Sequence, residues 1–179
     1  TDGISLNQVD IQTTRMTRLV PTSEQKRGGA FGEKHVVKYS FLEFFGFVNN
    51  HTDTLVSEED IQKMLGGMWN GTNGLSTTSK LGQASRLLMK INLKKDGFLS
   101  GLQNMNKIEP EKDIEDITDV VLHIDKLCKI LERAKSMIDD IEFKADPILE
   151  CSLDEEKGTF DEIFSSWAKK SKIKIKALP

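Results

Sequence analysis

Hydrophobic and polar positions along the chain follow two periods, and these predict its secondary structure. Residues 4–18 alternate in part and are rich in β-branched side chains, which predicts a strand. Residues 35–48 are dense in aromatic and β-branched side chains, which predicts a second strand, central in its sheet. Residues 86–94 alternate, and Asp96-Gly97 predicts a hairpin turn into Phe98-Leu99.

Helical spacing marks two further parts of the chain. Ser57, followed by three acids, predicts a helix start with a capping box. Its apolar stripe consists of Ile61, Met64, Leu65, Met68 and Trp69. We expect this helix to end at Asn70-Gly71, and a final short helix over residues 161–170.

The segment between these helices predicts a β-α-β order. Residues 120–124 and 138–144 are expected to be strands on either side of a helix capped by Asp125. One long helix over residues 113–141 is the alternative. We expect an acidic linker over residues 109–119. Residues 172–176 alternate Lys with Ile and predict an edge strand protected by lysines. The fold class is therefore α+β, a small sheet backed by helices.

Composition excludes several classes of protein. The 179 residues suffice for one domain with a sizeable core, and 37% hydrophobic with 30% charged residues is typical of soluble globular proteins. No apolar run approaches the roughly 20 residues that span a bilayer, so no membrane partner is expected. The two cysteines are far apart in the sequence, which favours a reducing, cytoplasmic compartment.

Positive charge is concentrated near the N-terminus of a chain whose net charge is −3. Residues 15–38 contain two acids and six bases, namely Arg15, Arg18, Lys26, Arg27, Lys34 and Lys38. Three glycines predict an open loop over residues 19–35, with Phe31 available for stacking. Such a loop suits a nucleic-acid backbone, and a solvated surface loop is the alternative. Residues 98–165, with 18 acids and 8 bases, would repel the same ligand.

No motif points to catalysis, a metal or a cofactor. The three histidines are isolated from one another and from both cysteines, and none has the spacing of metal ligands. Hydrolase, zinc-protease and phosphate-loop motifs are absent from the sequence. We therefore expect a protein that is not an enzyme.

Several segments, taken in order over residues 5–105, resemble a known family. They are Ser5–Arg15, Gly29–Tyr39, Phe44–Asn49, Ser57–Ile61, Met68–Asn73 and Arg86–Ile91. Their order and spacing resemble the CRISPR-associated backbone subunits of Cascade complexes (Cas family seven), nearest to the subtype I-B branch. Family members are longer, and this chain resembles their C-terminal portion. The chain is then a fragment, or residues are missing upstream, or another chain supplies the remaining half.

The resemblance implies a fold and a function. It implies an RNA-recognition-motif-like (ferredoxin-like) palm, incomplete over residues 1–150, with the basic loop 19–35 as a thumb-like insertion. Residues 151–179 would form a C-terminal helix and a basic tail. The protein would bind the guide RNA (crRNA) backbone and oligomerise along it in a type I antiviral ribonucleoprotein. The implied partners are guide RNA, target DNA paired with the guide, other Cascade subunits and copies of itself.

The resemblance also assigns RNA-contacting residues. Arg15 and Arg18 would lie at the palm edge, and Lys38 would enter the central strand. The loop would contribute Lys26, Arg27, Phe31 and Lys34. A second set around the turn after the first helix comprises Asn70, Asn73, Lys80 and Arg86, for which turn formation and solvation are the alternative.

Two other functions stay open at this stage. One is a protein–protein interaction module of RNA-recognition-like fold whose basic loop binds an acidic partner without RNA. The other is a metal-dependent ribonuclease. Relatives in type III complexes cut target RNA with a loop aspartate, but Glu24 and Glu33 are the only acids in the basic segment here. We therefore expect no nuclease activity.

Overall fold

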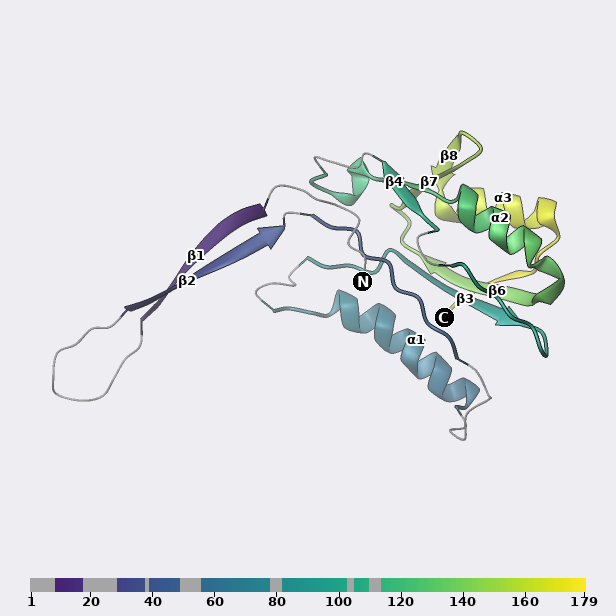
Figure 1. Cartoon of the computed structure of the whole chain (residues 1–179), viewed down its shortest axis with the longest axis horizontal. Helices are drawn as coiled ribbons and strands as arrows, with labels where there is room; N and C mark the ends of the chain where they lie inside the picture. The colour runs from purple at the N-terminus through teal and green to yellow at the C-terminus, as the bar shows by residue number, and fades with distance from the viewer. Residues whose placement is uncertain are drawn as a thin grey trace.

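The computed structural model (Figure 1) describes residues 9–17, 29–37, 39–48, 56–77, 82–102, 105–109 and 114–179, and only the backbone of the first two strands. The strands are β1 (Val9–Thr17), β2 (Gly29–Val37), β3 (Leu87–Leu93), β4 (Lys107–Glu109), β5 (Val121–His123), β6 (Ile138–Ala145), β7 (Glu150–Leu153), β8 (Glu156–Thr159) and β9 (Ile175–Ala177). The helices are α1 (Glu58–Asn73), α2 (Asp125–Arg133) and α3 (Phe160–Ser171), with short 3-10 turns η1 (Ile117–Asp119) and η2 (Lys135–Met137).

Apart from β1 and β2, the described strands form two small mixed sheets. In the first, β6 lies between an antiparallel β3 and a parallel β9. The second has the order β4-β5-β7-β8, in which only β5 and β7 run parallel. Strands β5 and β6 flank α2 in sequence but belong to different sheets. The predicted β-α-β order is therefore present, but α2 connects two sheets rather than two strands of one sheet.

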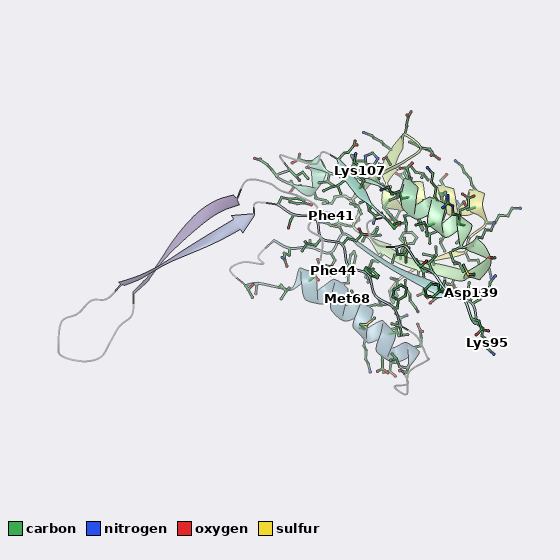
Figure 2. All side chains as sticks on the ribbon, in the orientation of Figure 1. Phe41, Phe44, Met68, Lys95, Lys107 and Asp139 are labelled. Carbon is green, nitrogen blue, oxygen red and sulfur yellow. The ribbon has the colours of Figure 1, made fainter. Side chains whose placement is uncertain are left out.

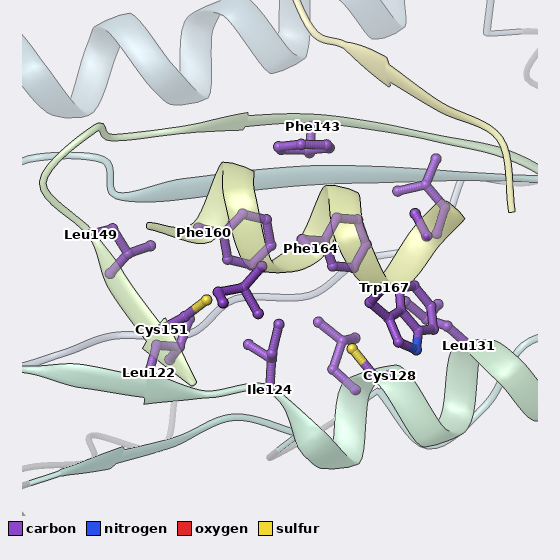
Figure 3. Close-up of a cluster of buried hydrophobic side chains, with 14 of the residues drawn as sticks. Leu122, Ile124, Cys128, Leu131, Phe143, Leu149, Cys151, Phe160, Phe164 and Trp167 are labelled. Carbon is purple, nitrogen blue, oxygen red and sulfur yellow. The ribbon is translucent and has the colours of Figure 1, made fainter. Parts of the chain in front are cut away.

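The sheets enclose one hydrophobic core together with α2 and α3. Helix α3 contributes Phe160, Phe164 and Trp167, and the Phe164 ring centroid lies 5.3 Å from that of Phe143 in β6. Figure 3 shows Leu122 of β5 on the opposite side of this aromatic row. The two aromatic side chains Phe160 and Phe164 are fully buried, so α3 is a central element of the core.

Helix α1 lies on the other side of the β3-β6-β9 sheet (Figure 1). Met89 and Ile91 of β3 pack against the core, so Lys90 between them points to the opposite face. There the Lys90 Nζ lies 2.5 Å from Glu58 Oε1 of α1 and 3.3 Å from Glu142 Oε1 of β6. The alternating strand thus separates an apolar face from a polar one, and α1 is attached to the polar one.

The start of α1 is confirmed, but few of its side chains are buried. Ser57 and Asp60 form the predicted reciprocal capping box. Leu65 is the only buried residue of the helix. Lys144 of β6 lies over the Trp69 ring, with its Nζ 5.5 Å from the ring centroid. The predicted apolar stripe therefore meets the sheet only in part.

The predicted central strand over residues 35–48 is wrong. Strand β2 ends at Val37, and residues 39–48 contain only an isolated bridge. Within the described chain β2 pairs with β1 alone, so it is not central either. Phe44 and Phe47 are 65% and 59% exposed. Phe44, Phe45 and Phe47 thus lie at the surface rather than in a sheet interior, whereas Tyr39 and Phe41 are partly buried against the core.

Part of the predicted basic loop is also a strand. Strand β2 begins at Gly29, so residues 29–35 are paired and extended, and Gly29 and Gly32 do not hold a loop open. Residues 19–28 lie outside the described residues. The strand predicted over residues 4–18 is confirmed at residues 9–17, where β1 lies.

The turn at Asp96-Gly97 is present, but it does not form a hairpin with Phe98-Leu99. Asp96 has a left-handed φ of 63°, and the Gly97 N–H donates to the Lys94 carbonyl at 2.9 Å. The partner of β3 is β6, and Leu99 is buried in the core without forming a strand. A long-range pairing has replaced the local one.

Two further expectations in the acidic part are wrong. Residues 110–113 of the predicted linker lie outside the described residues, and the described part is not a linker, because Glu109 ends β4 and Ile114 and Ile117 are buried core residues. Asp125 does not cap α2; it is the first helical residue, and its Oδ1 accepts a hydrogen bond from the Asp154 N–H. The carboxylate thus links α2 to the β7–β8 turn instead. The end of α1 at Asn73 also lies beyond the predicted Asn70-Gly71.

Several other elements match the predictions, whereas strands β4, β7 and β8 were not predicted. Strands β3, β5 and β6, helices α2 and α3, and the terminal edge strand β9 are confirmed, and the single helix over 113–141 is excluded. The class is mixed α+β, as expected. The more specific RNA-recognition-like palm and the division at residue 150 stay predictions. The core itself includes residues from both sides of that position, such as Phe143 and Phe160.

Candidate nucleic-acid interface

Strands β1 and β2 form an antiparallel ribbon that extends away from the rest of the described molecule (Figure 1). Its register places Arg15 opposite Phe31, and Lys34 opposite Gln12. Neither strand pairs with any other described strand. Three of the residues predicted to contact RNA are thus brought onto one two-stranded ribbon, which is open along both outer edges as far as the described chain extends.

Five of the predicted contact residues lie outside the described residues: Arg18, Lys26, Arg27, Lys38 and Lys80. Arg18, Lys26 and Arg27 belong to the segment that connects β1 to β2, and Lys38 directly follows β2. Their connection to the ribbon is therefore one of sequence, and their role stays a prediction.

The second set of predicted residues makes contacts within the chain. Arg86 donates from its Nη1 to the Asp146 Oδ2 at 2.5 Å, and both side chains are about four-fifths buried. Asn73 Oδ1 accepts from the Ser85 N–H at 2.8 Å, which ties the end of α1 to the approach to β3. The Asn70 side chain is exposed near the same helix end. Arg86 and Asn73 thus hold local structure, and a role for them in RNA contact stays a prediction.

Sequence reasoning missed an exposed apolar surface, which we call the aromatic patch: Phe44, Phe45, Phe47, Met64 and Met68. The three phenylalanines lie on residues 39–48 and the two methionines on α1; Figure 2 labels Phe44 and Met68. The Phe45 and Phe47 rings meet edge to face at 5.9 Å. The dense aromatic run was visible in the sequence, but density alone does not distinguish a core strand from a contact surface.

One side-chain arrangement resembles a hydrolytic triad and cannot act as one. The Ser152 Oγ lies 2.7 Å from His123 Nδ1, and His123 Nε2 lies 3.2 Å from Glu109 Oε2 without hydrogen-bond geometry. A hydrogen bond from Lys107, followed by the charge of His123, lowers the pKa of Glu109. Ser152 is only 2% exposed, so its hydroxyl cannot reach a substrate. The arrangement links β4, β5 and β7 structurally.

The described part of the chain also offers no reactive thiol or metal site. Cys128 and Cys151 are buried and unpaired, and burial raises the pKa of each thiol to about 12. Among the described residues, no group of three or more His, Cys, Asp or Glu side chains could hold a metal ion. No described helix is both long enough and apolar enough to cross a membrane.

Comparison with known proteins supplies the remaining evidence. A search of curated proteins found no match. A family model described as CRISPR-associated protein Cas7 matches residues 1–125, a segment that includes the ribbon, the aromatic patch and α1. Because this match covers well over half of the 179 residues, the chain belongs to the CRISPR-associated protein Cas7 family.

Proposed function

We propose that this chain is a non-catalytic subunit that binds the backbone of a guide RNA and oligomerises along it in a type I Cascade complex. Membership of the Cas7 family implies a CRISPR-associated, RNA-binding backbone subunit. We propose further that the bound RNA is a guide RNA, that the complex is a Cascade complex in the cytoplasm, and that the guide pairs with target DNA. We also propose that this chain corresponds to the C-terminal portion of a subtype I-B-like member of the family.

The β1–β2 ribbon is the observation that carries the RNA-binding part of the proposal. It places Arg15 opposite Phe31 and carries Lys34 on the same two strands. Cations attract phosphates irrespective of sequence, and an aromatic ring can stack on any base. A ribbon with both, attached to the body at one end, suits a ligand that is held along its backbone. Reading of the sequence is then left to base pairing.

The aromatic patch supports the assembly part of the proposal. Its five side chains, on residues 39–48 and on α1, are each between 46% and 65% exposed. Exposed apolar surface of this kind is typical of protein–protein contacts. We propose that the patch contacts a neighbouring subunit in the assembled complex.

A titration with single-stranded RNA at several salt concentrations tests the RNA-binding part. The triple variant Lys26/Arg27/Lys34→Ala is expected to bind at least about tenfold more weakly, with a salt dependence reduced by about one unit of slope per cation removed. The matched control is Lys126/Lys129/Lys157→Ala, which removes the same charge from α2 and β8. Equal affinities for the two variants would contradict the proposal. They would favour the interaction module that binds protein without RNA.

Sedimentation analysis tests assembly. With RNAs of increasing length, the parent protein is expected to form complexes whose mass rises in steps of one subunit. The variant Phe44/Phe47→Ser is expected to bind RNA but to assemble with weaker cooperativity, because it removes apolar surface from the patch without removing charge. Stepwise assembly that is the same in both proteins would show that the patch is not the subunit contact.

A further inference from the structure

A second concentration of positive charge lies in the part of the body built by the ends of α2, α3 and β3. There a cavity of about 520 Å³ opens between η2, the turn after β3 and the segment joining α3 to β9. The cations that line it are Lys94, Arg133, Lys135, Lys172 and Lys174. They come from three separate segments of the chain, so the fold rather than the sequence brings them together. We call this site the basic cavity.

The acids of the basic cavity do not neutralise it. Glu132 and Asp139 also line it, two carboxylates against five cations. Within the described residues, no carboxylate lies within ion-pairing distance of Arg133 or of Lys135, Lys172 and Lys174. The fifth cation, Lys94, has a partner that carries no charge, because its Nζ donates a hydrogen bond to the Ser136 carbonyl at 2.8 Å. The other four cations therefore face the cavity without an ion pair to the described chain, and the cavity keeps a net positive charge.

Cations near helix ends have a simpler role, which accounts for only part of this set. Arg133 and Lys172 stand at the C-terminal ends of α2 and α3, where one positive charge offsets the helix dipole. That effect is confined to the last turn of a helix. It does not account for Lys135 or Lys174, which lie beyond the two helices in η2 and before β9.

The backbone at Lys172 allows a charge-removing substitution that does not strain the fold. Lys172 caps α3 in the left-handed conformation, with φ of 56°. Glycine is favoured at this position because a Cβ is disfavoured there. A glycine would therefore be more stable than the lysine at this position, so Lys172→Gly removes the charge without adding backbone strain.

We propose that the basic cavity is a second nucleic-acid site that binds the phosphate groups of a phosphodiester backbone. No aromatic side chain lines it, so it offers charge for phosphates but no platform for stacking bases. This inference goes beyond the proposed function, because the ribbon and the cavity lie at opposite ends of the molecule. Figure 2 shows this separation: Asp139, which lines the cavity, and Lys95, which follows Lys94 in the chain, are labelled far from the ribbon.

Binding measurements on variants test the basic cavity. The probes are a short fluorescent duplex DNA of mixed sequence and a single-stranded RNA of equal length, each titrated at several salt concentrations. We expect Lys135/Lys172/Lys174→Ala to weaken binding of at least one probe about tenfold, with the salt slope reduced by about one unit per lysine. The probe that is affected identifies the kind of strand. The control is again Lys126/Lys129/Lys157→Ala, none of which lines the cavity.

The same titrations in the Lys26/Arg27/Lys34→Ala background separate the two proposals. An additional loss on removing the cavity lysines supports a second site, even if the ribbon variant alone binds normally. Affinities and salt slopes equal to those of the control in both backgrounds would overturn the basic cavity and leave the ribbon proposal intact.

Lys172→Gly provides an independent test that does not risk unfolding. Glycine removes the charge and suits the left-handed conformation, so the melting temperature is expected to rise while nucleic-acid affinity and salt slope fall. A higher melting temperature with unchanged affinity and slope would overturn the proposal.

Discussion

Helices α1 and α3 begin with the same local arrangement and differ in what they pack against. In each, a hydroxyl residue and an acid three positions later form a reciprocal capping box, Ser57 with Asp60 and Thr159 with Glu162. Helix α3 then buries six of its twelve residues, whereas α1 buries one of sixteen. Capping depends on four consecutive residues, but burial depends on what the rest of the chain brings to the helix. The two helices therefore contribute very differently to stability.

The same contrast separates the two parts of the molecule. The core consists almost entirely of residues from position 99 onwards, with β3 packed against it. The ribbon, residues 39–48 and α1 precede it, and all five residues of the aromatic patch are in this part. The family match covers this part completely. The C-terminal part therefore folds around its own core, while the described residues of the preceding part bury few of their side chains.

The largest effect is expected from a core substitution in α3. Phe164 is fully buried among Phe143, Phe160 and Trp167, so Phe164→Ala should lower the free energy of unfolding by about 3–5 kcal/mol. Urea titration followed by tryptophan fluorescence measures it. Met68→Ala in α1 is the matched comparison. Met68 is 46% exposed, so the expected loss is below about 1 kcal/mol. Similar losses from both substitutions would show that α1 is as firmly packed as α3.

A buried carboxylate tests the polar face of the β3-β6-β9 sheet. Asp140 accepts hydrogen bonds from the Lys176 Nζ and the Asn92 Nδ2, both at 2.6 Å, and these bonds lower its pKa in the folded protein. The stabilisation is therefore present at neutral pH and is lost as pH falls through the lowered pKa, below about pH 4. Asp140→Asn should cost about 1–2 kcal/mol at pH 7.

The pH dependence is the sharper part of this test. Other carboxylates titrate in both the parent and Asp140→Asn, so the difference between their unfolding free energies isolates Asp140. That difference should shrink as pH is lowered from about 5 to about 3. A difference that is constant with pH would mean that the variant perturbs packing rather than charge.

Features of the fold that depend on neighbouring residues were predictable from the sequence, whereas features that depend on long-range contacts were not. The capping box at Ser57 and the edge strand at Ile175 were predictable, because their signals lie within a few residues. The pairing of β3 with β6 was not, because Asp96-Gly97 gave a local hairpin signal and the real partner lies more than 40 residues away. The aromatic residues at positions 44, 45 and 47 were wrongly assigned to a sheet interior, because composition does not determine whether a side chain is buried or exposed.

The candidate interfaces show the same limit. The charge of residues 15–38 was visible in the sequence, but its pairing into a ribbon with Arg15 opposite Phe31 was not. The contact of Arg86 with Asp146, 60 residues later, gave no local signal. The basic cavity draws Lys94, Lys135 and Lys172 from three distant segments, so only the fold could bring them together.

Substitutions in the two capping boxes are expected to have an intermediate effect on the free energy of unfolding. Thr159→Ala should cost about 1 kcal/mol in global unfolding, because α3 unfolds with the core. Ser57→Ala removes the same kind of bond but should change global unfolding less, because α1 can open locally. Its effect is expected in faster hydrogen exchange across residues 61–72, with little change in α3. Equal changes in global unfolding would mean that both helices belong to one cooperative unit.

The smallest effect tests the attachment of α1 to the sheet. Glu58→Gln weakens the ion pair with Lys90, but the Glu58 side chain is 64% exposed and Lys90 keeps Glu142 as a partner at 3.3 Å. The expected cost is below about 0.5 kcal/mol, and it should fall further at high salt. Glu59→Gln is the matched control, because Glu59 pairs with Lys63 inside α1 and does not contact the sheet. If attachment depends on Lys90, exchange of the α1 amides should speed up in Glu58→Gln beyond any change in Glu59→Gln. Equal exchange in the two variants would leave Leu65, the Lys144–Trp69 contact and the hydrogen bonds of Ser85 to Asn73 and Trp69 to hold α1 in place.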